Sequence, residues 1–407
     1  MSKILYLSYD GMTDPLGQSQ VLPYVIGLAK AGYNMHIVSF EKADKLKELE
    51  HVIQKKLDKY QIKWSKLTFY SAIPILSKIW NQRKFNSIVK KICKTESVKL
   101  LHCRSYVAAI AALHVKKRLN IPYLFDMRGF WVDERVDSGN WDQKKWYYRL
   151  IYKRFKKIEQ ELVANANHII SLTEVGKDEI HNWQGYKSNP VKISVIPTCS
   201  DFEHFKVKTD YDHPNILSAL NIPKKQLIIG YLGNLESTYL PNELLKMFAA
   251  IKNSHSNSIF LVISKSSKSE FFKLVEKMNI PKSAIFFVSA QRDEVPALMS
   301  VFDYLLCFVK PTYAKLASSP TKIGEALAMG VPVICNDNIG DLKTIIAQLK
   351  GGIAFDNFSD EQFEAIATEV LAFSSNPSEL RKRAFEYYSL EAGVTKLEAI
   401  YTEIVAS

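Results

Sequence analysis

The chain has 407 residues, of which 47% are hydrophobic and 24% are charged, and its net charge is +12. A chain of this length is too long for one ordinary hydrophobic core and predicts two or three domains. The composition excludes a disordered or fibrous chain. The five cysteines form no Cys-x-x-Cys pair, which argues against a zinc site or disulfide framework and favours a reducing, cytoplasmic setting.

Charge is distributed unevenly along the chain. Residues 1–200 carry 33 basic and 18 acidic side chains, a net charge of +15, whereas the remainder carries −3. A basic half indicates an anionic partner, either nucleic acid or an anionic lipid surface. No segment approaches the ~18 uncharged apolar residues of a membrane-spanning helix. The first ten residues predict a strand rather than a signal peptide.

Short apolar runs alternate with helical patterns from the N-terminus onward. Ile4–Ser8 predicts a strand, a helix follows and ends at Gly32, and His36–Phe40 predicts the next strand, which makes a βαβ unit. Further strands are predicted at residues 100–103, 123–125, 168–172 and 193–196. Continuous apolar runs between helices are typical of parallel sheets covered on both faces. Residues 1–200 therefore predict an N-terminal Rossmann-like domain.

The pattern lapses over residues 201–226, which predicts a hinge or linker. It resumes with strands predicted at residues 227–232, 259–263, 285–288, 304–308, 331–335 and 353–355, and with helices at 241–252, 361–373 and 379–405. Residues 227–388 predict a second Rossmann-like domain, and residues 389–407 predict a C-terminal helix that packs back toward the N-terminal domain. The expected fold class is α/β, with two doubly wound parallel sheets facing across a cleft.

The strongest local signal precedes the helix predicted to begin at Thr321 and to end at Gly330. The N-terminus of a helix favours an anion because its N–H groups are free and its dipole is positive there. Ser319, Thr321 and Lys322 add two hydroxyls and a cation, which predicts a diphosphate site. Glu325 lies one turn further, where it would accept bonds from a ribose. The alternative is a capped helix with an exposed lysine and a solvated glutamate.

A second cluster follows the strand at residues 123–125. Asp126 and Arg128 are two positions apart at the end of this strand, so they point to the same face. Trp131, Asp133 and Glu134 follow at once, and aromatic rings with carboxylates predict a site for a sugar. The alternative is an Asp126–Arg128 ion pair that only holds the loop.

Two weaker signals concern phosphate and metal. Gly17 lies in the first β-to-α loop, where a glycine lets the backbone approach a phosphate or the transferred sugar, although a simple turn is the alternative. Asp210 and Asp212 spell the Asp-x-Asp of metal-dependent transferases, but they lie in the predicted hinge and are expected to be solvated. No metal and no cofactor are predicted.

Six blocks of the chain, in the same order, resemble glycosyltransferase family 4, whose members are retaining enzymes of GT-B fold. The blocks are Leu16–Gln20, Ile121–Gly129, Ala166–Glu174, Val195–Asp201, Ile229–Asn234 and the hallmark-like Gly324–Ile334. The resemblance covers nearly the whole chain and implies transfer of a sugar from a nucleotide-sugar donor, bound by residues 227–388, to an acceptor bound by residues 1–200. Gly233 and Asn234 fall in a matching block and are implied to contact this donor.

The chain departs from the family at several functional positions. Glu325 matches the second of the family's paired glutamates, which implies a ribose contact, but the first falls at Ala317. The phosphate-binding Arg and Lys of the family fall at Asn234 and Tyr239, and its active-site His falls at Arg128. A branch of the family that reads Ser-Pro-Thr-Lys before the helix shares such substitutions. In this branch the lysine is expected to take over the phosphate charge.

The segment 144–157 has a helical period, seven cations in fourteen residues and an aromatic face. Basic and aromatic helices suit the headgroup region of a membrane, which predicts a membrane surface formed by Lys144, Lys145, Arg149, Lys153 and Lys156. The alternative is an ordinary helix with core aromatics and solvated lysines.

These patterns predict a metal-independent, retaining hexosyltransferase that uses a UDP- or GDP-sugar and a hydroxyl of a lipid-linked or surface-glycan acceptor. Asp126, Arg128 and Lys322 are its predicted catalytic residues. The expected location is the cytoplasmic face of the membrane, in polysaccharide synthesis such as lipopolysaccharide or capsule. Alternatives are an epimerase or hydrolase of the same fold, a decayed transferase that only binds, and a nucleic-acid binder, which would explain the charge but not the donor-type motif.

Overall fold

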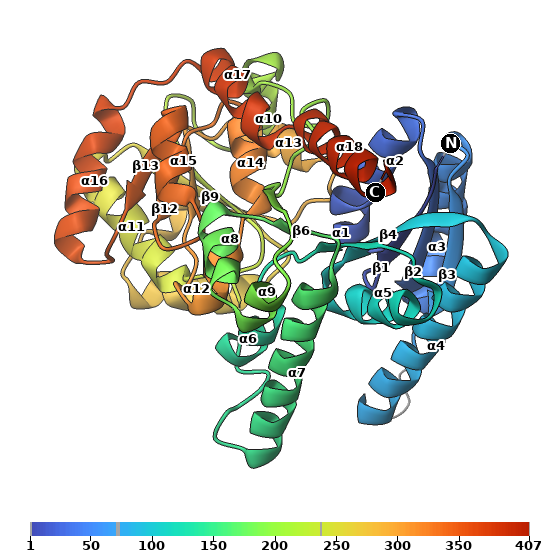
Figure 1. Ribbon diagram of the computed structural model, residues 1–407. Coiled ribbons are helices and arrows are strands. Elements are labelled where there is room, and N and C mark those ends of the chain that lie inside the picture. The colour runs from blue at the N-terminus through green and yellow to red at the C-terminus, as the bar shows by residue number, and fades with distance from the viewer. Residues whose placement is uncertain (1, 71–73, 237, 407) are drawn as a thin grey trace. The chain divides into compact units, whose positions relative to one another are not determined.

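The computed structural model describes residues 2–70, 74–236 and 238–406, and it divides into two compact units (Figure 1). Unit 1 consists of residues 1–197 together with 390–407, and unit 2 consists of residues 198–389. The chain therefore enters unit 2 once, leaves it once and completes unit 1 with its last helix.

Unit 1 is built on a parallel sheet with the strand order β3-β2-β1-β4-β5-β6-β7 across the described residues. Its strands are β1 (Lys3–Ser8), β2 (Asn34–Glu41), β3 (Lys63–Thr68), β4 (Val98–Arg104), β5 (Tyr123–Asp126), β6 (His168–Ser171) and β7 (Ile193–Val195). Its helices are α1 (Pro15–Gln20), α2 (Leu22–Lys30), α3 (Ala43–Asp58), α4 (Pro74–Thr95), α5 (Ser105–Leu119), α6 (Trp131–Asp137), α7 (Trp146–Asn165), α8 (Glu174–His181), α9 (Gln184–Ser188) and α18 (Leu390–Ala406).

Unit 2 contains a second parallel sheet, ordered β10-β9-β8-β11-β12-β13 across its described residues. Its strands are β8 (Leu227–Leu232), β9 (Ser258–Ile263), β10 (Ile285–Val288), β11 (Tyr304–Cys307), β12 (Val333–Asn336) and β13 (Gly352–Phe355). Its helical segments are η1 (Lys208–Asp210), α10 (His213–Ala219), α11 (Pro241–Ser254), α12 (Lys268–Lys277), η2 (Lys282–Ala284), α13 (Val295–Ser300), η3 (Tyr313–Ala317), α14 (Thr321–Ala328), α15 (Leu342–Leu349), α16 (Asp360–Ala372) and α17 (Pro377–Tyr388).

Alternate residues of the unit 2 strands enter two separate cores. Leu305 and Val333 pack in one core, whereas Leu306 and Ile334 pack in the other. The sheet is thus buried on both faces, as continuous apolar strands require. The expected α/β class with two doubly wound parallel sheets is confirmed.

One strand of unit 1 is absent from the sequence-based prediction. β3 lies at the edge of the sheet, where it pairs with β2 alone. Its sequence, Lys63–Thr68, alternates buried Trp64 and Leu67 with charged and polar side chains. An edge strand needs no continuous apolar run, so the search for such runs misses it.

The segment 201–226, expected to be a hinge, belongs to unit 2. Phe202, Phe205 and Ile222 are at most 5% exposed and lie in its core. The guanidinium of Arg381 also donates hydrogen bonds to the backbone carbonyls of Phe202 and Phe205. The segment shows no sustained period because it contains only the short helices η1 and α10 between irregularly spaced anchoring side chains, not because it is a linker.

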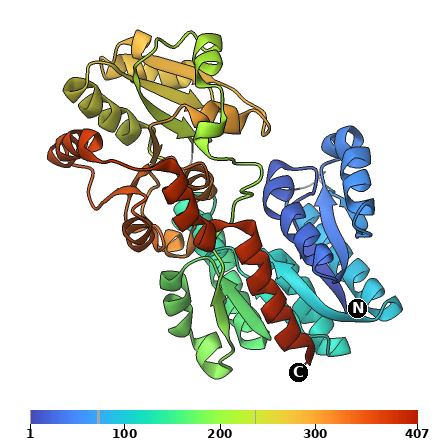
Figure 2. The same cartoon turned by 90° about the horizontal axis from the view of Figure 1, so that it is seen from above.

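The predicted continuous helix over residues 379–405 is two helices. Ser389 is extended (φ −70°, ψ 147°) and separates α17 from α18. The backbone N–H of Ser200 donates to the carbonyl of Tyr388, which ties the end of α17 to unit 2. Figure 2 shows α18, in red, running over unit 1, where it packs against α2 and β4.

Candidate functional site

Lys322 lies in the first turn of α14, the helix that follows β11 and η3. Its ammonium lies 4.4 Å from the ring centre of Tyr231 and 3.8 Å from that of Tyr239. The residue is 6% exposed, and among the described residues its Nζ has no hydrogen-bond partner. Burial lowers the pKa of Lys322 to about 8, against smaller raising effects of Cys307 and Glu325. A buried ammonium without a hydrogen-bond partner is stabilised when an anion binds beside it.

Gly233 brings the main chain close to this ammonium. It follows β8 in a left-handed conformation (φ +119°), and a Cβ there would lie 3.0 Å from Nζ of Lys322. Any other residue would strain the backbone and crowd the cation. Asn234 is exposed, and its carbonyl accepts a hydrogen bond from the hydroxyl of Tyr231.

Glu325 lies one turn along α14 and is 7% exposed. Burial raises its pKa, against smaller lowering effects of Arg292 and Lys322, and Nη1 of Arg292 lies 3.9 Å from its Oε1. Thr321 is half-buried at the first helical position, and Oγ of Ser319 accepts a hydrogen bond from the backbone N–H of Thr198 at 3.2 Å. In unit 2, Ser319, Thr321, Lys322 and Glu325 therefore lie at the N-terminus of α14, with Gly233 beside Lys322. Their contact with a donor stays a prediction.

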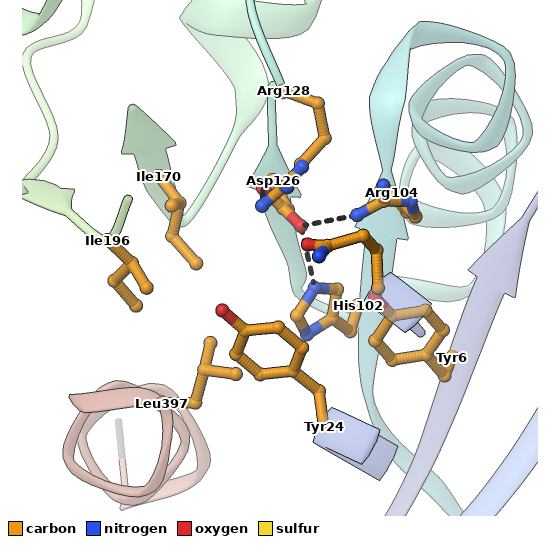
Figure 3. A pocket seen from close by; sticks show the side chains of 10 residues that line it. Tyr6, Tyr24, His102, Arg104, Asp126, Arg128, Ile170, Ile196 and Leu397 are labelled. Carbon is orange, nitrogen blue, oxygen red and sulfur yellow. Dashed lines mark ion pairs between the residues drawn. The ribbon is translucent and has the colours of Figure 1, made fainter. Parts of the chain in front are cut away.

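In unit 1, Asp126 is the centre of a buried polar cluster at the carboxyl ends of β4 and β5 (Figure 3). Its Oδ2 lies 3.6 Å from Nε2 of His102 and 4.0 Å from Nη1 of Arg104, and its Oδ1 lies 3.8 Å from Nη1 of Arg128. These residues, together with Tyr6, line one pocket. In the ranges that the structure describes, Nε2 of His102, Nε of Arg104 and Oδ1 of Asp126 are buried without a hydrogen bond.

Electrostatics keep this carboxylate ionised. Burial alone raises the pKa of Asp126, but Arg128, His102 and Arg104 together hold it below its ordinary value. Burial also raises the pKa of Tyr6 to about 12, so its hydroxyl stays protonated. Arg128 has a left-handed backbone (φ +59°), which is strained for a side chain of this kind. The ion pair between Asp126 and Arg128 is therefore present, and binding of a sugar by this cluster stays a prediction.

Sequence reasoning misses several residues of these two clusters. His102 and Arg104 lie in a strand predicted only as buried, and Tyr231 lies in another. Polar residues at the carboxyl end of a parallel strand are the signal that identifies His102 and Arg104. Arg292 comes from the loop between β10 and α13, where nothing in the sequence marks it.

Gly17 serves internal packing. It lies inside α1, and a Cβ there would meet the carbonyl oxygen of Gly11 at 1.9 Å. The absence of a side chain therefore lets α1 pack against the preceding loop. Its contact with a donor stays a prediction.

The structure places the expected sugar-binding residues after Arg128 differently. Both carboxylate oxygens of Asp133 are engaged, by the hydroxyl of Tyr152 at 2.8 Å and by Nζ of Lys156 at 2.9 Å. The ring of Trp131 packs against Trp141 and other aromatic rings. Asp133 thus holds α6 against α7 instead of facing a sugar, while Glu134 is half-buried.

The basic helix is α7, and most of the cations expected at a membrane surface are exposed. They are Lys144, Lys145, Arg149 and Lys153. Lys156 is the exception, because its ammonium pairs with Asp133 and with the buried Glu159. The first turns of α7 also expose Trp146 and Leu150, by 67% and 58%. Within the described ranges, no helix is long and apolar enough to cross a bilayer.

The Asp-x-Asp pair has a local structural role. Asp212 caps α10, since its carboxylate accepts from the backbone N–H and the side-chain amide of Asn215. Asp210 ends the short helix η1. Across the residues described by the structure, no group of three or more His, Cys, Asp or Glu side chains is arranged to hold a metal ion.

Two family profiles match the chain in succession. Residues 20–204 match the profile described as Glycosyltransferase Family 4, and residues 212–387 match Glycosyl transferases group 1. A D-inositol 3-phosphate glycosyltransferase of Corynebacterium urealyticum is 23% identical over 261 residues, which cover 60% of this chain and 59% of that protein. The match thus spans about three fifths of this relative's length.

Two further proteins are similar. One from Bacillus subtilis strain 168, named for a glycosyltransferase of teichuronic acid biosynthesis, is 26% identical over 69% of this chain and 64% of its own length. Among solved structures, the Anabaena protein HepE in complex with UDP-glucose has a TM-score of 0.67 at 11% identity, over 99% of this chain and all of that one.

Proposed function

The chain belongs to glycosyltransferase family 4 with the GT-B fold, and from this premise we propose that it transfers a hexosyl-type sugar from a UDP- or GDP-sugar to an acceptor hydroxyl, with retention at the anomeric carbon. Unit 2 would bind the donor and unit 1 the acceptor. The two named relatives suggest acceptors of the inositol phosphate or cell-surface glycan kind.

The observation that carries the proposal is the buried ammonium of Lys322. It has no hydrogen-bond partner within the described chain, it faces Gly233, and it lies at the positive end of α14. A diphosphate would supply the missing acceptors, and the helix N-terminus would favour its charge. The family's own Arg and Lys are replaced by Asn234 and Tyr239, so we assign their role to Lys322, since Arg292 is paired with Glu325.

Transfer requires positive charge beside the leaving diphosphate, because negative charge develops on this group. As the sugar acquires oxocarbenium character, the bond to the diphosphate breaks and negative charge accumulates on its oxygen. Lys322 would stabilise this charge, and Glu325 would accept hydrogen bonds from the ribose hydroxyls. The raised pKa of Glu325 suits a contact with a neutral group. In unit 1, Asp126 and Arg128 would lie against the sugar as catalytic residues.

A decayed transferase that only binds is the second candidate. It is favoured by the departures at Ala317, Asn234 and Arg128, because each removes a side chain that the family uses. An epimerase or hydrolase of the same fold would instead act on the donor without any acceptor.

A panel of UDP- and GDP-sugars should separate these candidates. We expect one of the donors to raise the Tm of the protein, because a ligand that binds the native state stabilises it. The same donor should then be consumed much faster with a glycan acceptor than without one. A Tm shift without turnover would indicate the decayed protein, and acceptor-independent release of UDP or altered sugar would indicate the hydrolase or epimerase.

We also propose that the transfer needs no metal ion, since Lys322 and the N-terminus of α14 supply the positive charge. Turnover should therefore be unchanged, within about twofold, after dialysis against EDTA. The control is a second sample to which Mg²⁺ or Mn²⁺ is returned. Complete loss of turnover with EDTA and its recovery with either ion would refute the metal-free mechanism.

A lipid-linked acceptor would place the enzyme at the inner face of the cytoplasmic membrane. This proposal is supported by the net charge of +15 on residues 1–200 and by the exposed cations of α7. The exposed Trp146, Tyr147 and Leu150 lie among these cations, and such a mixture suits the boundary between headgroups and acyl chains.

A further inference from the structure

Tyr401 connects the C-terminal helix α18 to the polar cluster of unit 1. It is 0% exposed, and its hydroxyl lies 2.6 Å from Nδ1 of His102, 299 residues away in sequence. The ring of His102 also stacks on Tyr6, with ring centres 4.3 Å apart. The imidazole is therefore fixed in position by a stacking partner and a short hydrogen bond.

The contacts of His102 with Tyr401 and with Asp126 determine which of its ring nitrogens carries the proton. Burial lowers the pKa of His102 and raises that of Tyr401 well above its ordinary value, so both groups are neutral. Nε2 faces Oδ2 of Asp126 at 3.6 Å, where an N–H attracts the carboxylate and a lone pair repels it. The proton therefore lies on Nε2, and Nδ1 accepts the hydrogen bond from the hydroxyl of Tyr401.

The carboxylate of Asp126 connects His102 to Arg128. Oδ2 of Asp126 faces His102 and Arg104, while its Oδ1 faces the guanidinium of Arg128 at 3.8 Å. Arg128 has a left-handed backbone and depends on its surroundings to keep this geometry. We propose that Tyr401 and His102 are positioning residues, which hold the carboxylate of Asp126 so that Arg128 is presented to the acceptor sugar. This inference rests on the proposed transferase activity.

Tyr401→Phe tests the hydrogen bond between Tyr401 and His102, and Tyr33→Phe is its matched control. The hydroxyl of Tyr33 also contacts α18, at the carbonyl of Glu398 and the hydroxyl of Thr402, both at 3.2 Å, but not His102. We expect kcat to fall roughly tenfold to a hundredfold in Tyr401→Phe, as for other small misplacements in a site, while the donor KM stays unchanged. Tyr33→Phe should keep the wild-type kcat.

His102→Gln and His102→Asn test the contact between His102 and Asp126. The amide of Gln extends to the position of Nε2 and can donate to Asp126, whereas the amide of Asn ends near the position of Nδ1. We expect His102→Gln to retain more activity than His102→Asn. In His102→Asn the pKa of Asp126 should rise, so the acid limb of the kcat profile should move to higher pH. The groups that face Asp126 and contribute to this limb are Tyr6, His102, Arg104, Arg128 and Tyr401.

A measurement without substrate keeps this inference separate from the proposed function. In protein with ¹⁵N-labelled histidines, the His102 signals should report the proton on Nε2, and Tyr401→Phe should shift them toward a mixture of both forms. His102→Gln identifies these signals by their loss. A proton on Nδ1 in the wild type, or wild-type kcat and spectra in Tyr401→Phe, would overturn the inference. A wild-type protein without transferase activity would instead refute the proposed function.

Discussion

Lys322→Met is expected to lower nucleotide-sugar turnover by roughly 30- to 1,000-fold, or about 2–4 kcal/mol, as for other single electrostatic stabilisers of a transition state. Met has a similar length and fills the space between Tyr231 and Tyr239, so the variant removes the charge and keeps the packing. Because the ammonium is buried with its pKa lowered to about 8, its charge costs stability at pH 7. The variant should therefore melt at the same or a higher temperature.

The depressed pKa also predicts a pH dependence. A diphosphate binds the protonated ammonium, so donor affinity in the wild type should fall as the pH rises through about 8, by up to roughly tenfold per pH unit. In the free protein, the folded pKa lies below that of an unfolded lysine, so wild-type stability should rise with pH between about 8 and ~10.4. Both trends should be absent in Lys322→Met, as titration calorimetry and thermal melts can show.

Lys322→Arg is the companion variant, because it keeps the charge while changing the shape of the group. It should recover part of the turnover that Lys322→Met loses. A folded Lys322→Met protein with wild-type turnover would remove Lys322 from the mechanism, and with it the main support for the proposed donor site.

Replacing Lys144, Lys145, Arg149 and Lys153 together with Gln is expected to release the protein from anionic liposomes. Each cation near an anionic surface contributes about 1 kcal/mol, so the four contribute up to about 4 kcal/mol, or roughly a thousandfold in partitioning. Lys156 stays in place because it pairs with Asp133 and Glu159. Binding should weaken with salt, since the Debye length is only ~8 Å at physiological ionic strength. Liposome flotation measures the bound fraction.

The matched control replaces four exposed lysines of α3 instead, which are Lys45, Lys47, Lys55 and Lys56. The net charge changes equally in both variants, so a loss of binding confined to the α7 variant locates the contact. Equal loss in both variants would indicate diffuse attraction. A wild-type protein that ignores anionic liposomes would make a soluble acceptor the better proposal.

Strands buried on both faces are the part of the fold that the sequence predicts best. β8 has the expected bounds, because its apolar run coincides with a strand whose four central residues are buried. β10 also has the expected bounds, although it lies at the edge of the sheet and only Ile285 is buried. The edge strand β3 escapes prediction since only two of its six residues, Trp64 and Leu67, are buried. The break at Ser389 also escapes, because the residues on both sides favour a helix, whereas the contacts at the break are tertiary: Ser389 is buried and the carbonyl of Tyr388 accepts a hydrogen bond from Ser200.

The candidate sites are predicted less completely. Lys322 and Asp126 are identifiable because they lie at the ends of predicted elements, where polar residues face a ligand. Their partners Tyr231 and His102 look like ordinary strand residues until the sheet is assembled. Asp133 is predicted to bind a sugar, but its carboxylate pairs with Lys156 of the next helix. No local sequence pattern reveals this pairing.

The return of α18 to unit 1 has a consequence for how the chain folds during synthesis. Residues 198–389 leave the ribosome as one continuous segment, so unit 2 has all of its elements before unit 1 does. Unit 1 must wait for its last helix, and the contact between His102 and Tyr401 spans nearly three quarters of the chain. Such long-range closure is slow. The earlier segment of unit 1 is therefore exposed to chaperones and proteases while the whole of unit 2 is made.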